Sequence, residues 1–305
     1  MGYRVGFVGL GTMGRPMAEF ILDAQLATGG SLTIHDLDRE RNVPILERGA
    51  RWAGTPRELA QSSDVVLFMV PEITDIRAVL DGEGGILDGL DHPVTLVVSS
   101  TCSPQDVRDL AETVSAVVPH VAVVDAPVSG GAEGAVSGTL SIMVGGEAND
   151  VQPVIDILRA AGTPLHLGPL GAGQVAKACN QLIVAAEVVA LAEASLLAER
   201  AGLDVAKLFA LLLGGYASSR VMEVKAHRFA THDHSPSGPA KFMIKDLRSV
   251  AEEAEQSGLA LVTIEPLRKI FTDLTNAGFG DYDTSVVQRY LEILSKPPTG
   301  DPAAD

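Results

Sequence analysis

Residues 4–14 read RVGFVGLGTMG, and this stretch decides the fold of the first part of the chain. Tyr3–Val8 is short and valine-rich, which predicts a buried strand, and Met13–Leu22 has the apolar spacing of a helix. A GxGxxG turn joins them. Such a turn lets the backbone approach a pyrophosphate and aims the helix N-terminus at it. The stretch therefore predicts a dinucleotide site, with cofactor contacts from Gly9, Gly11, Thr12, Met13 and Gly14.

An acidic residue follows at the spacing that this motif requires. Asp36 ends the second predicted strand, Leu32–His35, about 20 residues beyond the glycines. A carboxylate there accepts hydrogen bonds from both ribose hydroxyls of NAD and repels a 2′-phosphate by about 1–4 kcal/mol at contact. Arg39 and Arg41 could instead hold that phosphate. We predict NAD, with NADP as the alternative; Asp36 as a plain turn residue also remains open.

Three further apolar runs indicate a parallel sheet. Val65–Val70, Thr95–Val98 and Val121–Val124 are continuous and rich in β-branched residues, as expected of strands covered on both faces. Polar segments of helix length separate them, such as Pro56–Gln61 and Pro104–Val117. This alternation predicts βαβ units, and hence an α/β Rossmann-like N-terminal domain with a mostly parallel sheet.

The sequence changes character from Gly171 onward. Val175–Arg200 is long, rich in alanine and leucine, and nearly free of helix breakers, and shorter helical segments follow it. We predict an all-α C-terminal domain for substrate binding and oligomerisation. The predicted domains are residues 1–167 and 168–296, with a disordered tail at 297–305.

Charge and cysteine content exclude several classes of function. The 305 residues carry a net charge of −16, which disfavours binding to nucleic acid or to an anionic membrane surface. Cys102 and Cys179 have no metal or redox spacing, which is typical of a reduced intracellular protein. The stretch nearest to a membrane span, Leu182–Leu197, is interrupted by Glu187 and Glu193. We expect a cytoplasmic protein with no signal peptide.

Five stretches together resemble the β-hydroxyacid dehydrogenase family, which includes 3-hydroxyisobutyrate dehydrogenases and tartronate semialdehyde reductases. Their order and spacing match the family over nearly the whole chain. Ser99 departs from the aspartate that the family often has, although the Ser100-Thr101 pair is kept. The five stretches are Gly6–Met17, Ser99–Pro104, Asp125–Gly131, Gly168–Gln181 and Lys245–Leu247.

The resemblance implies a role for several individual residues. Lys177 would be the catalytic residue, and Asn180 would help to bind substrate. The substrate carboxylate would be held by Ser129, Gly130 and Gly131. The cofactor would be contacted by Val70, Pro71, Thr101 and Lys245. The same resemblance implies a homodimer or homotetramer acting on a small carboxylate.

The residue types are consistent with these roles. Lys177 lies in an otherwise small and apolar helical stretch, with Asn180 three residues on and hence on the same face. Apolar surroundings disfavour the charged form of a lysine and should lower its pKa, which suits proton exchange near neutral pH. N–H groups of the Ser129–Gly131 turn can receive a carboxylate. The alternatives are a surface lysine and an ordinary turn.

The histidines suggest a competing interpretation. His232 and His234 flank Asp233 in a loop rich in proline, serine and glycine, but without a ligand spacing of a known kind. We therefore predict no metal site.

The predicted reaction is reversible hydride transfer between NAD(H) and a small β-hydroxy acid, with Lys177 exchanging the proton. Asn180–Asp204 and Gly214–Val224 look most like tartronate semialdehyde reductases, which convert 2-hydroxy-3-oxopropionate to glycerate. The alternatives are 3-hydroxyisobutyrate or another small β-hydroxy acid. A non-catalytic dinucleotide-binding protein is the alternative of a different class, but such relatives of the fold typically lack the lysine.

Overall fold

The computed structural model describes residues 2–295, which form two compact units: one ends at Ala178 and the other begins at Cys179. The division falls inside one long helix, α8 (Ala172–Arg200). The boundary predicted between residues 167 and 168 lies 11 residues earlier and stays a prediction. The tail predicted at 297–305 lies outside the described residues.

The first unit contains one sheet of nine strands among the described residues, in the order β3-β2-β1-β4-β5-β6-β8-β7, with β9 also paired to β8. Strands β1 to β6 pair in parallel, and β8 is antiparallel to β6 and β7. The strands are β1 (Arg4–Val8), β2 (Ser31–His35), β3 (Arg51–Trp52), β4 (Val65–Phe68), β5 (Thr95–Val98), β6 (Ala122–Asp125), β7 (Val128–Ser129), β8 (Leu140–Gly145) and β9 (Gly162–Gly168).

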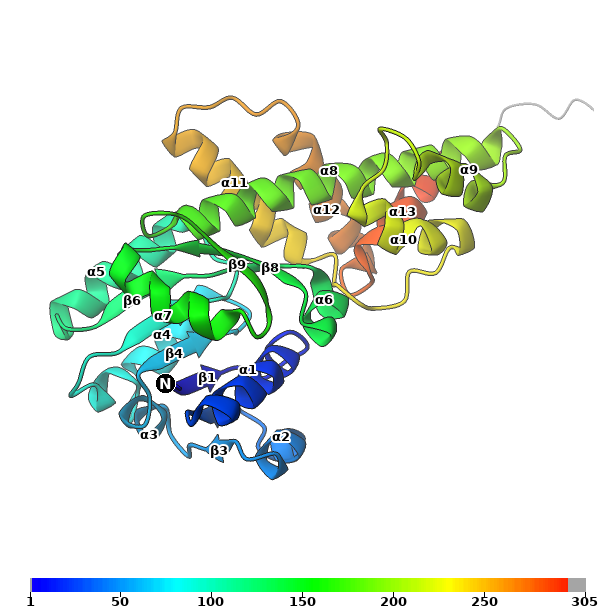
Figure 1. Cartoon of the computed structure of the whole chain (residues 1–305). Helices are drawn as coiled ribbons and strands as arrows, with labels where there is room; N and C mark the ends of the chain where they lie inside the picture. The colour runs from blue at the N-terminus through cyan, green and yellow to red at the C-terminus, as the bar shows by residue number, and fades with distance from the viewer. Residues whose placement is uncertain (1, 296–305) are drawn as a thin grey trace, which may run out of the picture. The chain divides into compact units, whose positions relative to one another are not determined.

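Helices cover both faces of this sheet (Figure 1). Along β4, Val65 and Leu67 join the apolar core that includes α1, while Val66 and Phe68 join the core that includes α5. Alternate side chains of a parallel strand are thus buried on opposite faces, which explains the continuous apolar runs. The helices are α1 (Gly14–Thr28), α2 (Val43–Glu47), α3 (Pro56–Gln61), α4 (Ile73–Asp81), α5 (Pro104–Val117), α6 (Gly131–Ser137) and α7 (Ala148–Leu158).

The second unit is helical. Beyond Gly171, the described residues contain no strand, only an isolated bridge between Pro239 and Asp283. The predicted fold class, a Rossmann-like α/β domain followed by an all-α domain, is confirmed. After α8 come α9 (Val205–Leu212), α10 (Arg220–Thr231), α11 (Phe242–Gln256), α12 (Ile264–Leu274) and α13 (Val287–Leu294), with a π-helical turn at Thr275–Phe279 and a 3-10 turn at Thr284–Val286.

Helix α8 is the one helix in the described part of the chain that is long and apolar enough to cross a membrane. In its most apolar window, 44% of the residues are buried inside the structure. The core helix of a globular protein has the same length and composition, so α8 alone is weak evidence for a membrane span.

Candidate functional site

The three glycines of the predicted cofactor loop each have a distinct geometry. Gly9 has φ +89°, and a Cβ there would lie 2.5 Å from the Met69 carbonyl oxygen. A Cβ on Gly14 would collide with the Gly9 carbonyl oxygen, whereas a Cβ on Gly11 would meet nothing within 4 Å. Gly9 therefore permits the turn, Gly14 permits close packing, and Gly11 leaves open space beside the backbone. This is the arrangement that a bound pyrophosphate requires, so the loop fits a dinucleotide.

The start of α1 and the acid at the end of β2 complete the loop. Met13, the N-cap residue of α1, makes no side-chain hydrogen bond to the first turn of the helix. The Leu10 N–H donates to Asp36 Oδ2 at 2.5 Å, and the Asp38 N–H donates to Asp36 Oδ1 at 3.1 Å. Asp36 thus lies directly beside the glycine loop, where the ribose of a dinucleotide is expected. Arg39 lies with its guanidinium carbon 5.9 Å from the centre of the Trp52 ring.

The other cofactor contacts predicted in the first unit lie at the same edge of the sheet. Val70 and Pro71 follow β4, which is the neighbour of β1, and Thr101 follows β5. The strand order reverses between β1 and β4, and such a reversal is where α/β sheets bind their ligands. The Val70 N–H donates to Ser100 Oγ at 3.0 Å, which joins the two loops. The structure therefore brings this group of predicted residues together.

The first turn of α8 is attached to the end of β6 by Asp125, which is fully buried. Its carboxylate accepts hydrogen bonds from the Gly171 and Gln174 N–H groups, each at 2.7 Å. Burial raises the pKa of Asp125 to about 6, although these backbone N–H groups act to lower it. Sequence reasoning missed the role of Asp125. The available signal was a carboxylate at the very end of an apolar strand, inside the DAPVSGG stretch.

Lys177 lies one helical turn after Gln174 and is 8% exposed. The alternative of a surface lysine is therefore wrong, because most of this side chain is removed from solvent. The lowered pKa that its apolar surroundings suggest stays a prediction. A buried amine that can gain or lose a proton has the chemistry that a general acid or base requires.

The predicted carboxylate-binding turn lies in the same unit as Lys177. Ser129 ends β7 and pairs with Ser141 of β8. Gly130 and Gly131 follow with φ +135° and +66°, both exposed, so an L-residue would be strained at either position. Ser129 is only four residues after Asp125, which limits their Cα–Cα separation to about 14 Å. Asp125 thus links this turn to the helix of Lys177.

Asn180 and Lys245 belong to the second unit, where a series of polar contacts connects them. Asn180 Nδ2 donates to Gln181 Oε1 at 2.8 Å, and Gln181 Nε2 donates to Asp246 Oδ2. Lys245 Nζ lies 3.2 Å from Asp246 Oδ1. The KDL stretch is therefore joined to α8. The cofactor contact predicted for Lys245 and the substrate contact predicted for Asn180 stay predictions.

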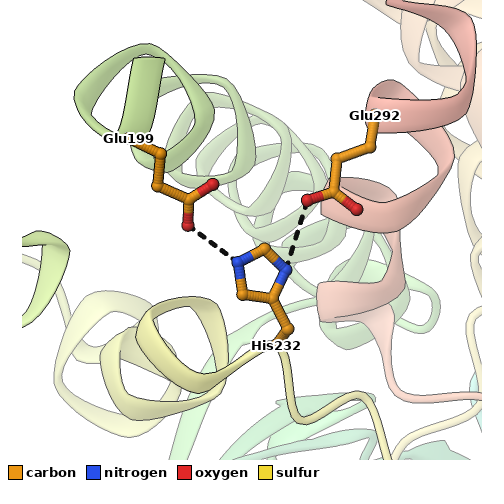
Figure 2. Close-up of side chains that lie close together, drawn as sticks. All are labelled: Glu199, His232 and Glu292. Atoms are coloured by element: carbon orange, nitrogen blue, oxygen red, sulfur yellow. Dashed lines mark hydrogen bonds and ion pairs between the residues drawn. The ribbon is translucent and has the colours of Figure 1, made fainter. Parts of the chain in front are cut away.

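The histidines do not form a paired site. His232 Nε2 lies 2.8 Å from Glu199 and His232 Nδ1 lies 3.2 Å from Glu292, so the ring stands between two carboxylates (Figure 2). His234 is buried, and its Nδ1 lies 3.0 Å from Ser285 Oγ. Glu199, His232 and Glu292 could each offer a ligand atom to a metal. The printed contacts are those of an imidazole between two carboxylates, and the absence of a metal site stays a prediction. Sequence reasoning missed the two glutamates because they come from α8 and α13.

Comparisons with known proteins agree with this geometry. The model described as the NAD binding domain of 6-phosphogluconate dehydrogenase matches residues 4–178, and that described as NAD-binding of NADP-dependent 3-hydroxyisobutyrate dehydrogenase matches residues 171–291. The chain is 35% identical over 277 residues to the "Probable 3-hydroxyisobutyrate dehydrogenase-like 3, mitochondrial" of Arabidopsis thaliana, covering 91% of this chain and 83% of that protein.

Two further relatives match nearly their full length. The 2-hydroxy-3-oxopropionate reductase of Escherichia coli is 34% identical over 297 residues, covering 96% of this chain and 98% of that protein. The crystal structure of 3-hydroxyisobutyrate dehydrogenase from Salmonella typhimurium superimposes with a TM-score of 0.83 at 29% identity, covering 94% and 99% of the two chains. The chain therefore belongs to the β-hydroxyacid dehydrogenase family, whose members are NAD(P)-dependent enzymes that act on a CH–OH group.

Proposed function

We propose that the protein reduces tartronate semialdehyde (2-hydroxy-3-oxopropionate) to glycerate with NADH. The observation that carries the proposal is the buried Lys177 at the start of α8, a helix tied through Asp125 to the strand that precedes the Ser129–Gly131 turn. The likeness to the 2-hydroxy-3-oxopropionate reductase of Escherichia coli, over nearly all of both chains, supports the choice of substrate.

The residues of the first unit divide the work between holding the acid and moving a proton. The N–H groups of the exposed residues Gly130 and Gly131, with the Ser129 hydroxyl, hold the substrate carboxylate. In reduction, the Lys177 Nζ ammonium donates a proton to the substrate oxygen as negative charge develops on it; in oxidation, the neutral amine accepts the hydroxyl proton. The nicotinamide, when bound, supplies or accepts the hydride.

The choice of NADH over NADPH rests on Asp36. Its carboxylate is held beside the glycine loop by the Leu10 N–H, so a 2′-phosphate on the ribose would approach a fixed negative charge. Of the two competing cations, Arg39 and Arg41, Arg39 lies over the Trp52 ring. The carboxylate therefore decides the preference in favour of NADH.

A second candidate substrate is 3-hydroxyisobutyrate, which the names of the Arabidopsis and Salmonella relatives favour. Its semialdehyde carries a methyl group on the carbon where tartronate semialdehyde carries a hydroxyl. The two semialdehydes share the carboxylate and the aldehyde, so the groups at Ser129–Gly131 and Lys177 would serve either of them.

The test is a panel of tartronate, methylmalonate and succinate semialdehydes, each assayed with NADH and with NADPH by the change in cofactor absorbance. We expect the highest kcat/KM with tartronate semialdehyde and NADH. Lys177→Met should retain NADH binding and lose about 100-fold or more in kcat, since general acid catalysis contributes about 10²–10⁴-fold. A higher kcat/KM with another semialdehyde would contradict the substrate, and turnover within threefold of wild type would remove Lys177 from its role. NADH binding with no turnover on any substrate would support the non-catalytic alternative.

A further inference from the structure

We propose that Asp125 is a positioning residue for Lys177, acting together with Gln174, and that this pair fixes the catalytic amine relative to the cofactor loops. The inference rests on the proposed role of Lys177. It concerns residues that lie entirely within the first unit.

Asp125 fixes both the place and the rotation of the first turn of α8. Its two carboxylate oxygens accept from different N–H groups, Gly171 to Oδ1 and Gln174 to Oδ2, each at 2.7 Å. Two bonds to positions three residues apart determine where the helix starts and how it is turned about its axis. Lys177 is three residues beyond Gln174 and lies on the same face of the helix, so the same contacts set the direction in which it leaves the helix.

The surroundings of Asp125 are shaped to hold a carboxylate at this point. A Cβ on Gly145, which pairs with Asp125 across the sheet, would collide with Asp125 Oδ1. A Cβ on Gly173 would lie 2.7 Å from Asp125 Oδ2. Strand β8 and helix α8 therefore close around the carboxylate at two positions that lack side chains. The cap of α8 comes from a strand 46 residues earlier in the chain, so the sheet rather than a local turn positions the helix.

Gln174 provides the second attachment and connects α8 to a cofactor loop. Its side chain is 1% exposed. Its amide nitrogen donates to the Ser100 carbonyl oxygen at 2.8 Å, and its Oε1 accepts from the Cys102 N–H at 3.1 Å. These two bonds bracket Thr101, the predicted cofactor contact. One buried amide thus sets the position of the Thr101 loop relative to the helix that carries Lys177.

The charge of Asp125 adds a second effect on Lys177. With a pKa of about 6, Asp125 is ionised at neutral pH, so a negative charge lies at the start of the helix, one turn before the amine. Negative charge there favours the ammonium form of Lys177. Two cationic or titratable groups also lie near this helix start: Arg108, whose Nη1 would lie 2.7 Å from a Cβ on Gly171, and His166, whose Nε2 lies 2.9 Å from the Gly168 carbonyl oxygen.

The test compares Asp125→Asn, which keeps the shape and removes the charge, with Asp125→Glu, which keeps the charge and displaces it. For both variants we expect a fall in kcat of about 10–100-fold, a smaller change in the KM for the semialdehyde, and an NADH dissociation constant within about twofold of wild type. Asp75→Asn is the matched control, because Asp75 accepts from the Glu72 N–H at the start of α4. It should leave kcat unchanged. Gln174→Met keeps the side-chain volume, removes both amide bonds, and should lower kcat about tenfold.

A readout that needs no turnover separates this inference from the proposed function. Competitive labelling of amines with acetic anhydride, quantified at Lys177 by mass spectrometry across pH, reports the ionisation of that amine. In Asp125→Asn, the labelling midpoint should move to lower pH by about half a unit or more, because the negative charge is gone. Absence of turnover in the wild type would sink the proposed function, yet the labelling would still decide the positioning role. Unchanged kcat and unchanged labelling in Asp125→Asn, or in a folded Gln174→Met if the aspartate variants do not fold, would overturn the inference.

Discussion

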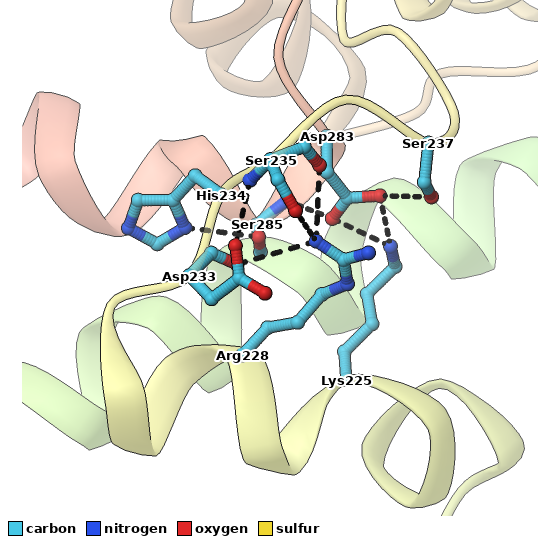
Figure 3. A network of polar contacts seen from close by, with 8 residues as sticks. All are labelled: Lys225, Arg228, Asp233, His234, Ser235, Ser237, Asp283 and Ser285. Atoms are coloured by element: carbon cyan, nitrogen blue, oxygen red, sulfur yellow. Dashed lines mark hydrogen bonds and ion pairs between the residues drawn. The ribbon is translucent and has the colours of Figure 1, made fainter.

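Replacing Lys225 by methionine should destabilise the second unit by about 3–5 kcal/mol, the cost of removing one partner of a buried ion pair. Asp283 is fully buried, and its two carboxylate oxygens each accept from Lys225 Nζ at 2.8 Å (Figure 3). Ser237 Oγ and the Ser285 N–H donate to the same carboxylate, each at 2.9 Å. Without Lys225, the carboxylate would stay buried while losing its counter-charge.

The effect of the pair on stability follows from the pKa of Asp283. Burial by itself raises this pKa, but the charge and hydrogen bonds of Lys225, together with the hydrogen bonds from Ser285 and Ser237, outweigh burial and lower it from 3.8 to about 2. At 1.36 kcal/mol per pKa unit, the ionised carboxylate contributes about 2 kcal/mol to stability. Because the folded-state pKa lies below the unfolded one, the contribution is present above about pH 4 and is lost as the pH falls towards 2.

Urea unfolding of Lys225→Met, Asp283→Asn and the double variant measures how much the ion pair contributes to the free energy of unfolding. The double variant should cost less than the sum of the two singles, because each single change leaves one buried polar group without its partner. Lys207→Met is the control: Lys207 pairs with Asp204 at 3.4 Å but is 86% exposed, so its loss should cost less than about 1 kcal/mol. The difference in unfolding free energy between wild type and Lys225→Met should become smaller below pH 4. A difference in unfolding free energy under about 1 kcal/mol at neutral pH, or one that does not become smaller in acid, would refute the reasoning.

Four further substitutions test the cofactor loop and the contacts of His232 with Glu199 and Glu292. Asp36→Ser should raise the NADPH/NADH ratio of kcat/KM by about fivefold or more, because a repulsion of at least about 1 kcal/mol is removed; an unchanged ratio would assign the preference elsewhere. Gly11→Ala should weaken NADH binding in a fluorescence titration at unchanged melting temperature, whereas Gly14→Ala should lower the melting temperature because its Cβ collides with the Gly9 carbonyl. His232→Gln should cost about 1 kcal/mol or less in urea, since its ring is 41% exposed, and should leave kcat as in wild type.

The elements predicted best from sequence are those with strong local signals. Pro56–Gln61 and Pro104–Val117 are helices with the predicted bounds. Each has proline in its first turn, and a hydroxyl of Thr55 or Ser103 caps it. The apolar runs of the parallel strands were equally clear, because a strand that is buried on both faces has apolar side chains at every position.

The elements that the sequence did not reveal lack such signals. Strand β9 contains Pro164 and all of its residues are half-exposed or exposed, so it shows neither an apolar run nor strict alternation. Strand β3 has two residues, and α7 carries Pro153 inside the helix. These elements owe their structure to pairing and packing with distant segments, which local patterns do not record.

The same contrast holds for the site. The glycine loop could be predicted because its contacts are local, down to the Cβ clash between Gly14 and Gly9. The roles of Asp125 and Gln174 could not, because their partners are 46 to 74 residues away. The sequence shows which residue types occur near Lys177, but only the fold shows which of them contact its helix.

Two fully buried carboxylates in this protein act on stability in opposite directions, and the difference separates a structural role from a positioning role. Asp283 faces the Lys225 cation, so its pKa falls and its charge stabilises the fold. Asp125 meets backbone N–H groups, and burial raises its pKa from 3.8 to about 6. Because the folded-state pKa is raised, its contribution is favourable below pH 3.8 and is lost as the pH rises through 6, a loss of about 3 kcal/mol at neutral pH. A residue held at that cost by a strand and a helix that close around it fits the positioning role proposed for Asp125, because stability alone would favour a neutral side chain.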